Sequence, residues 1–447
     1  MHFGWTAPPG AAEIDSPFSA RLTKAGERFS STTVATGGSI SVAAGPHRVS
    51  SDNLWIHLTE SIQRTTVEAP PLPFPFLGGY IGYLGYEMKG ACNGPNNHRS
   101  SLPDAIFLLA DRFLVIDHQE NALWLAGCAA HEDLGDIEQW IAEYSRWISE
   151  LRDDPTEPVL RGDGRQMRFR VLIPKQEYLR RIAKAQAYIA AGESYEICLT
   201  NKLYLRTEIP ALTYYQNLRA LNPAPYAAYL SLGDVEIACS SPECFLRIAE
   251  NGSVESRPIK GTLPRGQSEA EDLLLRSRLA ADEKYRAENL MITDLVRHDI
   301  GRVCGIGTVR VPQLMKVETY ATVHQLVSTL TGKLSSEASP IDCIRAAFPA
   351  GSMTGAPKLR TLELLDGLED EARGIYSGNI GYIGFNRTAD LNVVIRSAVF
   401  NKQDVSIGVG GAITFQSEAE QEWAEIMLKA KALLSAFSAA PRAPDFE

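Results

Sequence analysis

The chain has few of the features that mark a secreted or zinc-binding protein. Its seven cysteines are odd in number and scattered, and no two of them form a C-x-x-C pair. This pattern argues against a disulfide framework or a zinc site and predicts reduced thiols in a cytosolic protein. The first residues, MHFGWTAPPGAAEIDSP, lack a basic segment followed by an apolar one, so we expect no secretory signal.

Positive charge and long apolar runs are also scarce. The formal net charge is -10, whereas a surface for nucleic acid or anionic membrane would need a basic patch. The best apolar run, AIFLLADRFLVI from Ala105, is interrupted by Asp111 and Arg112 and is too short to span a bilayer. We therefore expect a soluble, cytoplasmic protein that binds neither nucleic acid nor membrane. Such a protein can still bind an anion locally through arginine, backbone amides or a metal.

The chain has ample material for a packed interior. Hydrophobic residues make up 45% of its 447 residues, enough for one large domain or two to three ordinary ones. The segment 152–166, RDDPTEPVLRGDGRQ, has the composition of a linker, so we expect an N-terminal region over 1–155 and a second region over 168–437. The second region mixes helices, such as QEYLRRIAKAQAYIAA before Gly192, with strands linked by hairpins. This mixture predicts an α+β fold rather than a regular βαβ alternation.

A lysine stands at the open end of a predicted hairpin, SPECFLRIAENGSVESRPIKGT. Lys260 lies near Pro258 and Gly261, which do not suit a helix interior, so its backbone is expected to be extended. The Asn-Gly pair at 251–252 predicts a two-residue type I′ turn, and counting outward from it places Glu243 opposite Lys260. Side chains so placed have Cβ atoms roughly 5 Å apart. They form either an ordinary cross-strand ion pair or an acid and an amine placed for chemistry, and a bulge at Pro258 would shift this register.

The predicted C-terminal helix, SEAEQEWAEIMLKAKALLSAF, has two distinct faces. Ser417 and Glu420 have the spacing of a capping box at its start. One face is apolar and is expected to pack on a core. The other consists of Glu418, Glu422, Glu425 and Lys429. These charges form either a solvated face with intrahelical pairs or, with Glu288 of the helix DEKYRAENLMITDLVRHDIG, ligands for Mg²⁺.

Two glycine-containing segments can bring backbone amides close to an anion. FPAGSMTGAPKLR, at 348–360, is a turn before a helix start. VGGAIT, at 409–414, contains Gly410 and Gly411. Neither segment has the spacing of a phosphate-binding P-loop.

Taken in order, the motifs resemble those of the chorismate-utilising enzymes. The matching segments between about 168 and 437 are SPECF, PIKGTLPRG, AENLMITDLVRHD, FPAGSMTGAPK, RGIYSGNIGYIG, VGGAIT and EWAEIMLKAKALL. FLGGYIGYLGYE, at 76–87, resembles the N-terminal region of the same family. The resemblance implies the fold of anthranilate synthase component I, in which layered antiparallel β-sheets are flanked by helices around a central active-site cleft.

The resemblance also implies a role for each residue of a site. Lys260 would be the nucleophile that attacks the chorismate ring, and Glu243 would be the acid for the departing 4-hydroxyl. The implied ligands of Mg²⁺, which binds the ring carboxylate, are Glu288, Glu422 and Glu425. The implied contacts to the substrate are Gly261, Thr262, Tyr376, Arg396, Gly410, Gly411, Ala412 and Lys429.

The residue at position 260 separates two branches of the family. Aminodeoxychorismate synthases carry lysine there and anthranilate synthases carry alanine, so the resemblance implies amination at C4 to 4-amino-4-deoxychorismate, for 4-aminobenzoate and folate. The alternatives are anthranilate synthase component I and a non-catalytic homologue that binds chorismate or tryptophan. No cysteine lies in a glycine-rich elbow of the glutaminase kind, so we expect ammonia from a glutamine amidotransferase subunit.

Three positions depart from the family pattern. Gln325 stands where histidine is often found, and Ala412 stands where glycine is common. Glu196, in GESYEICLT, replaces the glutamine that is frequent in aminating members. The isochorismate and salicylate synthases carry lysine at this position as a base for water, so its absence argues against that branch.

Overall fold

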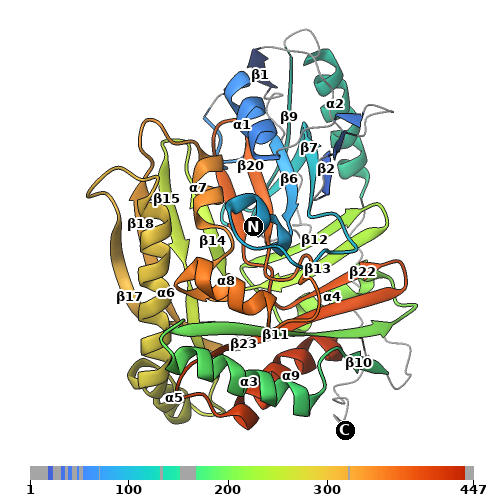
Figure 1. Cartoon of the computed structure of the whole chain (residues 1–447). Coiled ribbons are helices and arrows are strands. Elements are labelled where there is room, and N and C mark those ends of the chain that lie inside the picture. The colour runs from blue at the N-terminus through green and yellow to red at the C-terminus, as the bar shows by residue number, and fades with distance from the viewer. Residues whose placement is uncertain are drawn as a thin grey trace.

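The computed structural model describes residues 19–23, 32–35, 39–42, 48–49, 54–69, 71–130, 134–151, 168–320 and 323–437. These residues form β-sheets flanked by helices, with nearly all strand pairs antiparallel (Figure 1). The α+β fold predicted from the sequence is thereby confirmed. The predicted linker, 152–166, lies outside the described residues, so the boundary between 1–155 and 168–437 stays a prediction.

The largest sheet has twelve strands and is built from both the early and the late parts of the chain. Strand β6 pairs along its whole length with β20, so the N-terminal strands continue the sheet of the later ones. In FLGGYIGYLGYE the backbones of neighbouring strands approach closely, because a side chain at Gly82 would collide with the Ile106 carbonyl. The strands are β2 (Thr32–Ala35), β3 (Ser39–Val42), β4 (Arg48–Val49), β6 (Gly79–Leu84), β7 (Ala105–Ala110), β14 (Cys244–Ile248), β15 (Ser253–Arg257), β16 (Ile259–Pro264), β17 (Arg310–Thr319), β18 (Val323–Lys333), β20 (Asn379–Gly384) and β21 (Ala389–Asn392).

A second sheet of seven strands lies against the first, and a small sheet of four strands lies at one end. The seven strands are β10 (Phe169–Val171), β11 (Glu196–Arg206), β12 (Tyr226–Leu232), β13 (Val235–Ser241), β19 (Gly355–Ala356), β22 (Ser397–Asn401) and β23 (Asp404–Ile413). The four are β1 (Ser19–Thr23), β5 (Thr66–Glu68), β8 (Arg112–Asp117) and β9 (Ala122–Ala130). In the second sheet β11 and β23 pair over ten residues, which makes them its longest contact.

The helices cover the outer faces of the sheets (Figure 1). They are α1 (Leu54–Arg64), α2 (Leu134–Glu150), α3 (Lys175–Ala190), α4 (Ala211–Leu221), α5 (Glu269–Ala281), α6 (Glu283–Gly301), α7 (Pro340–Ala347), α8 (Lys358–Asp366) and α9 (Ala419–Ser435). Helix α3 ends as predicted, since Gly192 has a φ of +78° and donates its N–H to Ile189. None of the described helices combines the length and the apolar character that crossing a bilayer requires.

The capping box predicted for the C-terminal helix is wrong. Helix α9 begins after Glu418, whose side chain makes no capping bond. The Ser417 hydroxyl instead donates to Glu422 Oε1 over 2.7 Å, which anchors one of the predicted metal ligands. The apolar face of α9 packs as predicted, with Met427, Ala430 and Leu434 buried.

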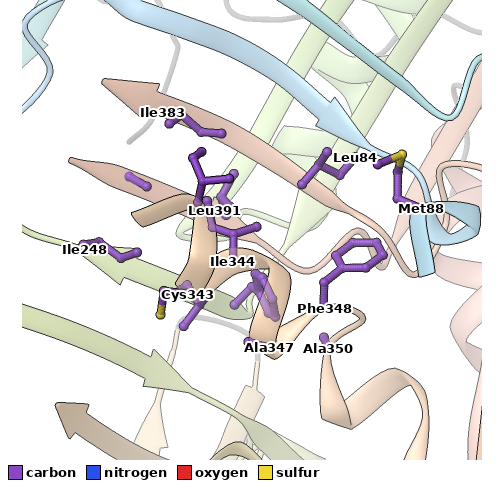
Figure 2. Packing of buried hydrophobic residues seen from close by; sticks show 14 of the residues in the cluster. Leu84, Met88, Ile248, Cys343, Ile344, Ala347, Phe348, Ala350, Ile383 and Leu391 are labelled. Carbon is purple, nitrogen blue, oxygen red and sulfur yellow. The ribbon is translucent and has the colours of Figure 1, made fainter. Parts of the chain in front are cut away.

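Apolar side chains fill three layers of the molecule. One core lies between the second sheet and helices α3, α4 and α9. Another lies between the large sheet and helices α1, α6 and α7, where Ile344 and Ala347 of α7 pack against Leu391 of β21 (Figure 2). A third, which includes Tyr83 and Val399, joins the inner faces of the two sheets. Burying each such side chain stabilises the fold by roughly 1.5–3 kcal/mol, so the sheets form a firm frame for the groups between them.

Candidate active site

Lys260 lies on β16 in the extended backbone that its neighbours predicted. The next residue, Gly261, has a φ of +84°, and a Cβ there would lie 2.8 Å from the Tyr285 ring, so only glycine fits. Only 9% of the Lys260 surface is exposed. A lysine that is buried to this extent needs a partner for its charge.

The predicted register of the Lys260 hairpin is wrong. The turn has three residues, 250–252, and the last of them is a glycine with a φ of +80°. A bulge in β14 shifts the pairing again, so that Cys244 faces Arg257. Glu243 therefore does not stand directly across the ladder from Lys260, because each extra residue on one arm displaces every later pair.

The direct partner of Lys260 is Glu196, at the start of β11. Lys260 Nζ lies 2.6 Å from Glu196 Oε1, and the Glu196 side chain has no exposed surface. Two hydrogen bonds fix the backbone on either side of Glu196: the Ser194 hydroxyl donates to Glu196 O, and the Tyr195 N–H donates to Ala356 O. Glu196 Oε2 is buried and has no hydrogen-bond partner among the described residues.

The charges around Lys260 favour its ammonium form. Burial lowers the pKa of Lys260, but the carboxylates of Glu196 and Glu288 outweigh that effect and hold this pKa above its ordinary value. The same burial acts in the opposite sense on Glu288, whose pKa it raises to about 7 although Lys260 lowers it. Lys260 therefore stands as a cation among acidic groups from two different elements.

Glu243 lies in the same buried site, immediately before β14. Burial raises the pKa of Glu243 to about 7, while Ser352, Lys260 and the Ile259 N–H lower it. The backbone of Glu243 is held by the Val393 N–H, which donates to its carbonyl over 3.1 Å. Although the predicted register is wrong, Glu243 and Lys260 interact electrostatically, and the carboxyl is poised to give up a proton near neutral pH.

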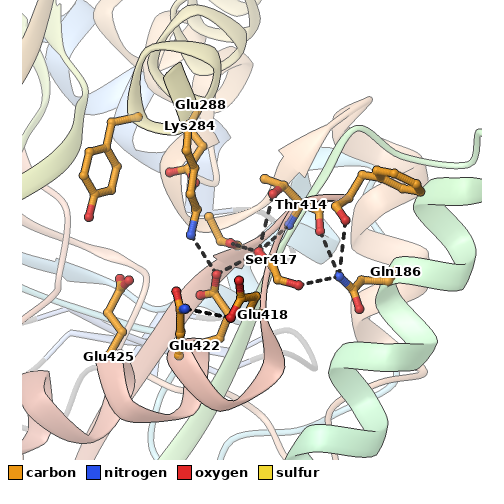
Figure 3. Close-up of polar contacts among 12 residues, drawn as sticks. Gln186, Lys284, Glu288, Thr414, Ser417, Glu418, Glu422 and Glu425 are labelled. Carbon is orange, nitrogen blue, oxygen red and sulfur yellow. Dashed lines mark hydrogen bonds and ion pairs between the residues drawn. The ribbon is translucent and has the colours of Figure 1, made fainter. Parts of the chain in front are cut away.

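The three carboxylates predicted to bind a metal lie on two facing helices (Figure 3). Glu288 comes from α6, and Glu422 and Glu425 come from α9. The Lys284 side chain reaches between them, with Nζ 2.9 Å from Glu422 Oε1 and 4.0 Å from Glu288 Oε1. Among the described residues, no three acidic, histidine or cysteine side chains are close enough to form a metal site as they stand. The ammonium of Lys284 is the cation at this position in the structure.

The glycine pair Gly410 and Gly411 lies within strand β23, close to these carboxylates. A Cβ on Gly411 would lie 3.2 Å from Glu422 Oε2, so the backbone comes close to the acidic groups. Lys429 Nζ donates to Gly410 O over 2.9 Å and forms an ion pair with Glu425 over 2.8 Å. Strand β22 pairs with β23 only as far as Ile407, so the segment 408–413, which includes Ala412, has a partner strand on its β11 side alone. Amides on the other edge are available to a ligand.

Arg396 is the one predicted substrate contact that carries an unpaired charge. Within the described part of the chain, its guanidinium makes no hydrogen bond or ion pair, and burial lowers its pKa. Its backbone has a φ of +51°, and its carbonyl accepts the Ser240 N–H over 3.1 Å. Tyr376 is buried with its ring against Gly408, where a side chain would collide with it. A half-buried arginine without a partner suits an anionic ligand.

One of the departures from the family pattern, Gln325, lies beside β16, the strand that carries Lys260. Gln325, on β18, faces Thr262 and donates weakly to its hydroxyl over 3.4 Å. The adjacent His324 contacts Asp272 and Thr319 instead, so it points away from this pair. The structure thus gives His324 a structural role and leaves Gln325 beside the predicted substrate contact Thr262.

Sequence reasoning missed Lys284 and the pairing of Glu196 with Lys260. Lys284 lies four residues before Glu288 on the same helix, a spacing that could have pointed to their contact. Nothing in the local sequence links Glu196 to Lys260, because 64 positions separate them along the chain.

Comparison with known proteins identifies the family of this chain. The profile of the chorismate binding enzyme family matches residues 20–435. The chain belongs to this family. An aminodeoxychorismate synthase of Streptomyces pristinaespiralis is 44% identical over 389 residues, which are 86% of this chain and 54% of that protein. Anthranilate synthase component 1 of Streptomyces coelicolor is 36% identical over 397 residues, which are 85% of this chain and 76% of that protein.

Solved structures of the family confirm the fold predicted from the motifs. Anthranilate synthase component I from Streptococcus pneumoniae matches with a TM-score of 0.78 at 26% identity, over 96% of this chain and 95% of that one. The isochorismate synthase MenF from Escherichia coli matches with a TM-score of 0.64 at 17% identity, a likeness of fold alone. The chain spans about half the length of the aminodeoxychorismate synthases that it matches.

Proposed function

We propose that this chain replaces the C4 hydroxyl of chorismate with ammonia and so makes 4-amino-4-deoxychorismate, the precursor of 4-aminobenzoate and folate. The observation that carries this proposal is the buried amine of Lys260 in one site with Glu243, whose pKa burial raises to about 7. A non-catalytic protein that only bound chorismate would need neither a buried nucleophile nor a buried acid. The relative at 44% identity is named an aminodeoxychorismate synthase, whereas the relative at 36% identity is named an anthranilate synthase component 1. This difference supports amination at C4 over anthranilate synthesis.

The chemistry follows from these two residues. The Lys260 amine attacks C2 of the ring, both double bonds of the ring diene shift by one position, and the C4–O bond breaks with its electron pair on the departing oxygen. Hydroxide is a poor leaving group, so the Glu243 carboxyl protonates the departing oxygen and water leaves. Ammonia then attacks C4, and the bond from C2 to Lys260 breaks in the reverse shift. Because the lysine occupies C2, the incoming amine is directed to C4.

The donor set of the acidic cluster fits Mg²⁺, which prefers carboxylate oxygens and retained waters. The ammonium of Lys284 lies at this position, with Nζ 2.9 Å from Glu422 Oε1, so the acidic cluster already stabilises a positive charge. Glu288 and Glu425 would hold the metal, with Glu422 beside them. When bound, Mg²⁺ would neutralise the ring carboxylate and withdraw electron density from the ring.

The remaining residues bind and orient the substrate. Chorismate is a dianion, and Arg396 has an unpaired guanidinium for its enolpyruvyl carboxylate, with Tyr376 as the implied neighbour. The free edge of β23 at 410–412 and the ammonium of Lys429 suit the other carboxylate. Gly261 and Thr262 follow Lys260 on β16 and would line the ring.

The source of ammonia is a separate part of this proposal. We expect a glutamine amidotransferase unit to deliver it, because no described cysteine is both exposed and next to a base. The purified 447-residue chain should then use ammonium salts but not glutamine. Glutamine-dependent product formation should appear when an amidotransferase subunit is added, and efficient use of glutamine by the chain alone would contradict this expectation.

Identification of the product tests the main proposal. The chain is incubated with chorismate, Mg²⁺ and an ammonium salt, and the products are separated and identified by mass and absorbance. The expected product is 4-amino-4-deoxychorismate. Anthranilate as the main product would mean that ammonia itself reaches C2, and the function would then be that of anthranilate synthase component I. Unchanged chorismate that is bound tightly would favour a non-catalytic homologue.

A further inference from the structure

The pair formed by Glu196 and Lys260 poses a problem for the proposed reaction. An amine is a nucleophile only when it has lost its extra proton, yet Lys260 is held as an ammonium. Its Nζ contacts Glu196 Oε1 over 2.6 Å, a distance at which a proton can pass directly. Besides Glu196, the groups that interact electrostatically with Lys260 from the surrounding elements are Glu288 of α6, Glu425 of α9, Cys198 of β11 and Glu243 before β14. Among the described residues, only Glu196 contacts the amine directly.

We propose that Glu196 is the proton acceptor that converts Lys260 into a nucleophile, an inference that rests on the function proposed above. Burial favours this transfer, because moving one proton from Nζ to Oε1 removes both charges of an ion pair that water does not reach. The other three carboxylates have other tasks in that function: Glu243 must be protonated to act as the acid, and Glu288 and Glu425 face the cation position.

The proton balance closes over one turnover. The ammonium of Lys260 gives one proton to Glu196, and the neutral amine forms its bond to C2 while Glu243 protonates the leaving hydroxide. When ammonia displaces the lysine, the electron pair of the bond to C2 returns to Nζ, and the free amine takes its proton back from Glu196. The new ammonium group at C4 gives one proton to Glu243, so both carboxyl groups are restored.

The orphaned oxygen of Glu196 agrees with this task. Oε2 is buried and lacks a hydrogen-bond partner among the described residues. An ionised carboxylate that served only to anchor a lysine would be expected to satisfy both oxygens, because a buried oxygen without a hydrogen-bond partner destabilises the fold.

The test is the pH dependence of adduct formation in Glu196→Gln, which keeps the shape of the side chain and loses its basicity. Wild-type chain and variant are mixed with chorismate and Mg²⁺ without ammonia, quenched at short times, and assayed by intact-protein mass for the adduct on Lys260. Glu193→Gln, an exposed change three residues earlier, is the matched control. Chorismate binding is measured separately by equilibrium titration and should change less than about twofold, because Glu196 makes no proposed contact with the substrate.

In the wild type, the adduct rate should be level below about pH 7 and fall above it as Glu243 loses its proton. In Glu196→Gln, the rate at about pH 6 should drop on the order of 100-fold and rise about tenfold per pH unit toward pH 7, since solvent must now take the proton. The new rising limb is the signature of the lost acceptor. Glu193→Gln should keep the wild-type profile.

Several outcomes would overturn the inference. An adduct rate in Glu196→Gln equal to that of the wild type, with no rising limb, would show that Glu196 takes no proton from Lys260. A faster rate would show that Glu196 restrains the lysine instead. An adduct rate that rises with pH in the wild type would also show that Glu196 takes no proton from Lys260. This second measurement does not depend on how well the variant folds. Absence of any adduct on the wild type would instead refute the lysine mechanism, and with it the proposed function.

Discussion

Replacing Glu243 with glutamine should strongly slow the proposed amination and yet stabilise the folded chain in alkaline solution. Burial raises the pKa of Glu243 from the ordinary 4.5 to about 7, and only 4% of the residue is exposed. The unfolded chain releases this proton at a lower pH than the folded chain does. The stability that the protonated carboxyl contributes is therefore complete at pH values below the pKa of Glu243 in the unfolded chain. It is lost as the pH rises through the pKa of Glu243 in the folded chain. The free energy of unfolding of the wild type falls by about 3 kcal/mol over this pH range. Glutamine is neutral throughout, so the variant does not lose this stability.

Thermal unfolding of wild type and Glu243→Gln, followed by circular dichroism at about pH 5 and about pH 8.5, measures this effect. The two midpoints should nearly coincide at the lower pH, and the variant should unfold at the higher temperature at the upper pH. Turnover should fall by about 10²–10⁴-fold, the usual contribution of a general acid. Glu250→Gln, an exposed change on the same hairpin, should alter neither quantity. An identical pH dependence of stability in wild type and Glu243→Gln would refute the reasoning, because the carboxyl would then be ionised in the folded chain.

Three further predictions concern the other members of the site. Chorismate and Mg²⁺ without ammonia should leave a covalent adduct on the wild type, and Lys260→Ala should remove it; an adduct that persists on the variant by intact-protein mass would exclude Lys260 as the nucleophile. Glu288→Gln should weaken Mg²⁺ binding by about 10–100-fold in calorimetric titration, since an oxygen ligand loses its charge; a normal affinity would mean that the ligand is misassigned. Lys284→Met should tighten Mg²⁺ binding in the same titration, because the ammonium that lies 2.9 Å from Glu422 no longer competes. Weaker binding would mean that Lys284 helps to hold the carboxylates in place.

The sequence alone predicted the extended backbone at Lys260, the buried face of the last helix and the family. Pro258 and Gly261 argued against a helix around Lys260, because proline lacks an N–H donor and glycine has a low helix propensity, and the structure has a strand there. The spacing of Met427, Ala430 and Leu434 placed one face of the last helix in the core. These features depend on backbone preference and on periodicity, which neighbouring residues carry. The order of the motifs was enough to identify the family that the profile over 20–435 confirms.

The contacts among the charged side chains of the candidate active site depend on tertiary packing. A three-residue turn and a bulge displaced Glu243 from the position that a regular ladder predicts, and such slips depend on packing rather than on local pattern. Glu196 reaches Lys260 because β11 of the second sheet faces β16 of the first, a juxtaposition that spans 64 positions of the chain. Lys284 lies among the carboxylates because α6 and α9 face each other. Contacts between separate elements depend on how the sheets and helices stack. The residue pattern within one element does not indicate which other element lies against it.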